Sequence, residues 1–90
     1  MITKHEREII LKCAEKYNVS SVFLFGSSIE KGEYEDIDIG VKGIEPRLFF
    51  KFYAELVKNL PKNVDLVDLS KKSLFNLNFE LVEINSRYLV

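Results

Sequence analysis

The 90-residue chain is 47% hydrophobic and 30% charged, with a net charge of −1, which favours one globular domain over residues 1–90 and excludes a disordered chain. The small net charge leaves no basic field for a nucleic-acid backbone, so direct nucleic-acid binding is not expected. A single cysteine excludes an internal disulfide, and there is no leader pattern and no apolar run near the roughly 20 residues of a membrane span. These features predict a soluble cytoplasmic protein.

The first predicted element is a helix of about 14 residues. Thr3 and Glu6 form a capping-box pattern, in which the Thr3 hydroxyl and the Glu6 carboxylate each bond a backbone amide of the other residue. Apolar residues then recur at helical spacing as far as Tyr17. Cys13 lies on this apolar stripe, and His5 lies in the polar first turn, so we interpret Cys13 as packing and His5 as a solvated surface residue.

Two strands follow, from Ser20 to Phe25 and from Asp36 to Val41. Residues 26–31 predict a turn and a short helix, and a polar loop leads into the second strand. A parallel crossover usually needs a dozen or more residues, whereas barely ten join these strands. We therefore expect an antiparallel pair within a mixed sheet.

The second half of the chain predicts two further helices and two further strands. Pro46 begins an amphipathic helix that Pro61 ends, and Val64 to Leu69 read as a third strand. A fourth helix, capped by Ser70 or Ser73, is expected to run to about Ile84, with a short strand over 87–90. The order α-β-α-β-α-β-α-β predicts an α/β (α+β) fold, a mixed sheet flanked by helices.

The predicted C-terminal helix carries more apolar side chains than one helix face can bury. Phe75, Phe79 and Val82 share a face beside the expected core face, and Phe50 falls off the stripe of its own helix. Scattered exposed apolar side chains are normal in small domains. Their concentration at the C-terminal end nevertheless favours a surface for a partner chain or for self-association.

Carboxylates set into two strands are the strongest chemical signal. Asp36 and Asp38 alternate with isoleucines, so both point to one face with Cα atoms about 6.5 Å apart. Unpaired charges beside a buried strand cost free energy of folding, and a divalent cation is the simplest partner for two carboxylates. Asp65 lies mid-strand and is the third candidate, because Asp68 at the strand end can be satisfied by a cap or by solvent. Three carboxylates suit two Mg²⁺ ions that hold nucleotide phosphates.

A turn with phosphate-binding character precedes these carboxylates. Gly26 and Ser27 lie between a strand and a predicted helix start. Glycine lets an anion approach the backbone, helix-start amides point toward it, and the serine hydroxyl adds a donor. Such a turn is weak evidence alone and gains weight beside the three carboxylates.

The motif Phe25-Gly26-Ser27, followed after eight residues by Asp36-Ile37-Asp38 and later by Val64-Asp65, resembles the minimal nucleotidyltransferases of the DNA polymerase beta-like superfamily. The resemblance covers essentially the whole chain. It implies two Mg²⁺ ions held by the catalytic residues Asp36, Asp38 and Asp65. It also implies ATP contacts from Gly26, Ser27, Ser28 and Lys31, and transfer of AMP with release of pyrophosphate. Many such proteins are antitoxins paired with a HEPN-type toxin, and some adenylylate a tyrosine of that toxin.

Two positions depart from the family pattern. The family commonly has arginine directly after Gly-Ser, where this chain has Ser28, and Glu30 stands where a second basic residue is frequent. Lys31 can supply charge but not the bidentate contacts of arginine. The leading hypothesis is therefore an adenylyltransferase acting on a partner in trans. The alternative is a weakly active or inactive antitoxin that neutralises its partner by stoichiometric binding, and a purely structural domain is disfavoured by three costly in-strand acids.

Overall fold

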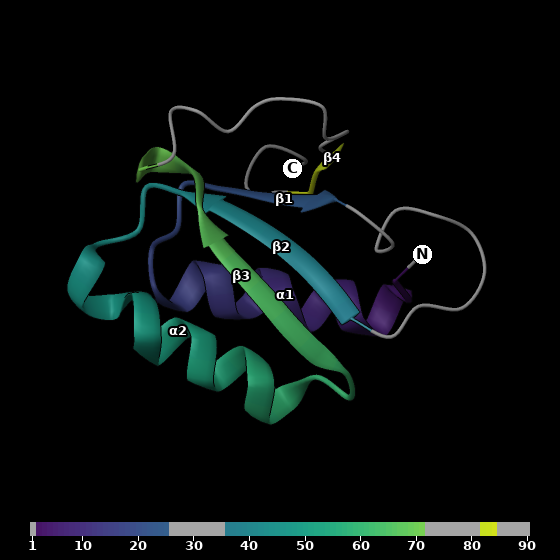
Figure 1. The fold of residues 1–90 in the computed structure, drawn as a ribbon. Helices are drawn as coiled ribbons and strands as arrows, with labels where there is room; N and C mark the ends of the chain where they lie inside the picture. Colours follow the sequence, from purple (N-terminus) through teal and green to yellow (C-terminus); the bar gives the residue numbers. More distant parts are fainter. Residues whose placement is uncertain (1, 26–35, 72–81, 85–90) are drawn as a thin grey trace.

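The computed structural model describes residues 2–25, 36–71 and 82–84, and these residues form a four-stranded sheet with two helices on one face (Figure 1). The strands run in the order β3-β2-β1-β4. In chain order the elements are α1 (Lys4–Lys16), β1 (Ser21–Phe25), β2 (Asp36–Lys42), α2 (Pro46–Asn59), β3 (Asn63–Asp68), the 3₁₀ turn η2 (Leu69–Lys71) and β4 (Val82–Glu83).

The capping box at the start of α1 is confirmed. The Glu6 amide donates to Thr3 Oγ1 over 3.0 Å, and the Thr3 amide donates to Glu6 Oε1 over 2.9 Å. These bonds satisfy two amides at the helix start and account for a buried glutamate there. The helix ends before Asn18, which takes a left-handed φ of 57° that asparagine tolerates well.

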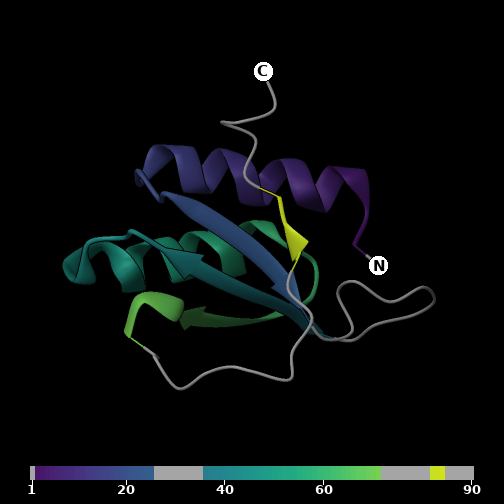
Figure 2. The same ribbon diagram turned by 90° about the horizontal axis from the view of Figure 1, so that it is seen from above.

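The sheet is mixed, as predicted. β1 and β2 are antiparallel, with Val22 opposite Val41 and Phe25 opposite Asp38. β2 and β3 are parallel and are connected through α2, which begins with Pro46 at its first turn as expected. Figure 2 shows β2 between β1 and β3, and η2 directly after β3. The predicted fold class is therefore confirmed.

The hydrophobic core lies between the helices and one face of the sheet. Strand residues that alternate with the aspartates are buried there, because successive side chains point to opposite faces. Cys13 belongs to this core, in agreement with its interpretation as a packing residue. The largest fully buried side chains are Phe52, Ile10, Ile37, Ile39, Leu56, Val19, Val22 and Val41.

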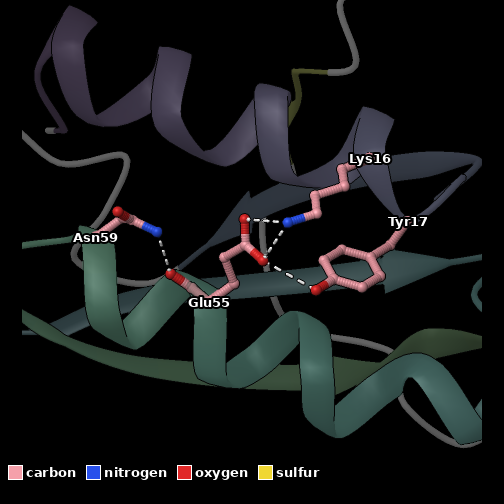
Figure 3. A network of polar contacts seen from close by, with 4 residues as sticks. All are labelled: Lys16, Tyr17, Glu55 and Asn59. Atoms are coloured by element: carbon pink, nitrogen blue, oxygen red, sulfur yellow. Dashed lines mark hydrogen bonds and ion pairs between the residues drawn. The ribbon is translucent and has the colours of Figure 1, made fainter.

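A polar network joins the two helices at their solvent side (Figure 3). Lys16 Nζ lies 2.9 Å from Glu55 Oε1 and 3.1 Å from Oε2, and the Tyr17 hydroxyl donates to Oε1 over 2.9 Å. Asn59 Nδ2 donates to the Glu55 carbonyl oxygen over 2.8 Å. The network fixes the C-terminal end of α1 against the middle of α2.

The expectation of a helix running to about Ile84 is wrong at its C-terminal end. Val82 and Glu83 form β4, which pairs antiparallel with Leu24 and Phe23 of β1. The Ile84 amide also donates to the Val22 carbonyl over 2.8 Å, and Ile84 is buried. A short apolar run is compatible with a strand as well as with a helix. Here the pairing with β1 makes Val82 and Glu83 a strand. The remainder of that helix, the short helix over 26–31 and the strand over 87–90 lie outside the described residues.

Candidate functional site

Asp36 and Asp38 lie on the face of β2 that points away from the helices. The buried residues Ile37 and Ile39 alternate with them and face the core, while both aspartates are partly exposed. Neither described helix covers this side of the sheet (Figure 1). The two carboxylates therefore lie on an accessible face of β2, whose residues Ile37 and 39–41 are buried.

β3 brings a third carboxylate to the same face. Asp65 is the register partner of Asp38, and Asn63 is the partner of Asp36. Directly opposite residues on neighbouring strands share a face and lie about 4.8 Å apart. Asp65 is exposed, whereas its neighbour Val64 is buried. We call Asp36, Asp38 and Asp65 the carboxylate row.

Asp68 has a different position and a visible structural role. Its register partner is Val41, which faces the core, so Asp68 does not join the carboxylate row. Its Oδ1 accepts a hydrogen bond from the Ser70 amide over 3.0 Å and so caps η2. This is the kind of local cap expected for the acid at the strand end.

The predicted phosphate-binding residues Gly26, Ser27, Ser28 and Lys31 lie outside the described residues. The structure does locate the point at which the chain reaches them. Phe25, which directly precedes Gly26, is the last residue of β1 and the register partner of Asp38. The end of β1 thus lies beside the start of β2, where the carboxylate row begins.

Leu69 covers the far end of the same face. Gly40 follows Asp38 by two residues, and a Cβ built on Gly40 would lie 2.7 Å from Leu69 Cδ1. The Ser70 hydroxyl accepts a hydrogen bond from the Gly43 amide over 3.3 Å and helps to hold η2 there. The contact was not predicted from the sequence, although a glycine inside a strand often marks a close approach of another chain segment. Leu69 therefore limits the accessible length of the face.

A shallow pocket of about 260 Å³ borders Asp65 on the other side, between α2 and β3. Its wall combines apolar and aromatic side chains with a nearly equal contribution from polar atoms. It is lined by Phe49, Phe50, Tyr53, Val64, Asp65 and Leu66. Phe50 is 75% exposed, and its ring packs edge-to-face on Phe49 with the centroids 5.5 Å apart. Only the off-stripe position of Phe50 signalled this pocket in the sequence.

The sequence was compared with models of known protein families. A family model described as "Polymerase beta, Nucleotidyltransferase" matches residues 7–87. The chain belongs to this nucleotidyltransferase family. The match spans both strands that carry the row and confirms the resemblance drawn from the Gly-Ser and Asp-x-Asp motifs. No curated protein and no solved structure gives a significant match.

The carboxylate row partly fits the divalent metal ions that nucleotidyltransferases use. Its donors are carboxylate oxygens, the ligands that Mg²⁺ prefers. Within residues 2–25, 36–71 and 82–84, however, no group of three acidic, histidine or cysteine side chains is placed to hold a metal ion. Mg²⁺ is often held by one or two carboxylates and completed by substrate phosphates. The adjacent pair Asp38 and Asp65 suits that incomplete kind of site, with Asp36 beside it.

No helix in the described part of the chain combines the length and apolar character that crossing a membrane requires.

Proposed function

We propose that this nucleotidyltransferase transfers AMP from ATP to a hydroxyl group, a tyrosine by preference, on a HEPN-type toxin partner, and so acts as an antitoxin. The observation that carries the proposal is the register of Asp38 with Asp65, which gathers acids from two strands on one accessible face. Membership of the family supports nucleotidyl transfer as the chemistry. The specific acceptor rests on the resemblance of the motifs to antitoxins of this type.

The transfer is an in-line displacement at the α-phosphorus of ATP. The acceptor hydroxyl oxygen forms a new bond to this phosphorus, the bond to the bridging oxygen of the β-phosphate breaks, and pyrophosphate leaves. Asp65 is exposed on an outer strand, where an acceptor can approach, so we assign its carboxylate to take the hydroxyl proton. Asp38 and Asp65, with Asp36 beside them, would also hold Mg²⁺, which when bound neutralises charge on the triphosphate and the leaving pyrophosphate.

A variant pair tests the nucleotide site. Asp36→Asn with Asp38→Asn removes two acids of the row without changing their size, so Mg²⁺-dependent ATP binding should be lost while the fold is kept. Calorimetric titration with ATP in the presence and absence of Mg²⁺ measures the binding. Asp68→Asn is the matched control, because Asp68 caps η2 and lies outside the row. Equal affinity of the double variant and the wild type for ATP with Mg²⁺ would show that the carboxylate row does not bind the nucleotide.

A second assay tests the transfer itself. The wild type, ATP, Mg²⁺ and the purified partner should give a partner that gains the mass of one AMP group. Asp65→Asn should bind the partner normally but slow transfer by about a hundredfold or more, because general-base catalysis acts only once the acceptor is in place.

The alternative function is neutralisation by stoichiometric binding. Ser28 and Glu30 replace basic residues common in the family, and this substitution is the observation that favours it. The same assay separates the two functions. A wild-type protein that silences its partner without any gain of mass would favour the binding antitoxin.

A further inference from the structure

β3 is the outermost strand at one side of the described sheet, since the strand order places it beside β2 alone. Half of the backbone amides and carbonyls of an outermost strand point away from the sheet. Such an edge is the usual place for an extended peptide to add as a further strand. Among residues 2–25, 36–71 and 82–84, no other strand pairs with this edge of β3.

The aromatic pocket lies along this same edge. Phe50 and Tyr53 are 75% and 38% exposed, and both border the pocket together with residues 64–66 of β3. A large aromatic side chain exposed to this degree is available for contact with another chain, and buried aromatics are common anchors of interfaces. Asp65 is therefore both a member of the carboxylate row and part of the pocket wall.

The alternation of side chains along a strand relates these two features. A residue opposite Asp65 on an added strand would share the face of the carboxylate row. Its neighbours in sequence would point to the other face, on which Val64 and Leu66 contribute to the pocket. One short extended segment can thus present a hydroxyl to Asp65 and an apolar side chain to the pocket.

We propose that the acceptor polypeptide docks as an added strand on the outer edge of β3, with its hydroxyl residue opposite Asp65 and an adjacent apolar residue in the pocket formed by Phe49, Phe50 and Tyr53. The inference rests on the proposed function and specifies how that site selects its acceptor. The exposed carboxylate of Asp65 beside this edge favours a segment with flanking lysine or arginine residues. A tyrosine next to a large apolar residue fits both faces.

Two synthetic peptides of identical composition test the alternation. In Lys-Val-Phe-Tyr-Phe-Val-Lys the phenylalanines flank the tyrosine, whereas in Lys-Phe-Val-Tyr-Val-Phe-Lys they lie two residues away. Titration of ¹⁵N-labelled protein, without ATP, should show the first peptide binding at least about tenfold more tightly. Amide shifts should concentrate on β3 and α2. N-methylation of alternate peptide amides should abolish binding, because it removes the donors of strand pairing.

Protein variants supply matched controls. Phe50→Ser should weaken the first peptide by at least about tenfold. Val57→Ser should not, because Val57 is 44% exposed on the same helix but does not line the pocket. Equal binding of the two peptides, or shifts elsewhere on the protein, would overturn the inference. So would a dimer, seen by sedimentation, that Phe50→Ser dissociates, since a second copy would then occupy the edge.

Failure of the proposed function can be distinguished from failure of the docking inference. Peptide binding is measured without ATP, so it tests docking alone. A peptide that docks as expected but never receives AMP would support the docking site on β3 and contradict the proposed AMP transfer. If the wild type and Phe50→Ser transfer AMP to the partner at equal rates, the result would contradict docking on β3 and support the proposed AMP transfer.

Discussion

The Tyr17 hydroxyl donates a hydrogen bond to Glu55 Oε1 over 2.9 Å, so the C-cap residue of α1 is held against α2. Hydrogen bonds from Lys16 and from Tyr17 lower the pKa of Glu55. The same contacts with Glu55 raise the pKa of Lys16 and the pKa of Tyr17. Folding and the protonation of these three groups are therefore linked.

The direction of each shift predicts the pH dependence of stability. The contribution of Glu55 is present above its unfolded pKa of about 4.3 and is lost as the pH falls through its lower folded pKa. The contributions of Lys16 and Tyr17 are present below unfolded pKa values of about 10 and are lost as the pH rises through their higher folded values. The difference in melting temperature between wild type and Glu55→Gln should be widest between about pH 6 and 9 and should narrow toward both extremes. A constant difference across the titration would contradict the linkage.

Two phenylalanines of α2 should differ sharply in their importance for stability. Phe52 is fully buried, with its ring 5.9 Å from that of Tyr17, whereas Phe50 is 75% exposed. Phe52→Ala should lower the free energy of unfolding by about 3–5 kcal/mol through lost burial and a residual cavity. Phe50→Ala should change it by no more than about 0.5 kcal/mol. Urea denaturation measures both, and similar losses would contradict the placement of α2.

Asp65→Asn should leave the fold as stable as the wild type. Asp65 is exposed and lies opposite Asp38, and like charges opposite one another on neighbouring strands are unfavourable. Removing one charge should change the free energy of unfolding by less than about 0.5 kcal/mol, or raise it slightly. Denaturation in urea checks this, and a large loss would indicate that Asp65 has a structural role.

Gly43 should not tolerate a side chain. Its φ is +78°, and a Cβ there would collide with the Ser20 hydroxyl oxygen. Gly43→Ala should lower the free energy of unfolding by at least about 1–2 kcal/mol for the left-handed conformation alone. Ser20→Gly removes the colliding side chain, so the double variant should recover the steric part of the loss. A double variant no more stable than Gly43→Ala would show that the backbone conformation accounts for the whole effect.

Local signals in the sequence predicted most of the fold. The capping box at Thr3, the proline at the start of α2 and the short connection between β1 and β2 each depend on neighbouring residues alone. β4 was missed because an apolar run suits helix and strand alike, and only pairing with Phe23 and Leu24 decides between them.

In the candidate site, too, some features follow from local sequence and others depend on contacts between distant residues. Alternation along one strand was enough to place Asp36 and Asp38 on one face. The position of Asp65 beside Asp38 depends on the register of β3, and the aromatic pocket depends on how α2 packs beside that strand. Neither can be derived from local pattern, because both are contacts between distant parts of the chain. The catalytic and nucleotide-binding roles of these residues stay predictions.

The parallel pairing of β2 with β3 has a consequence for the order of folding. Asp36 and Asp38 lie in a hairpin with β1, a local structure of the kind that closes within microseconds. Asp65 reaches them only through the long connection that contains α2, and non-local parallel pairing is intrinsically slow. We expect the nascent or partly folded chain to carry two of its three acids in place, and to lack a complete site until β3 has paired.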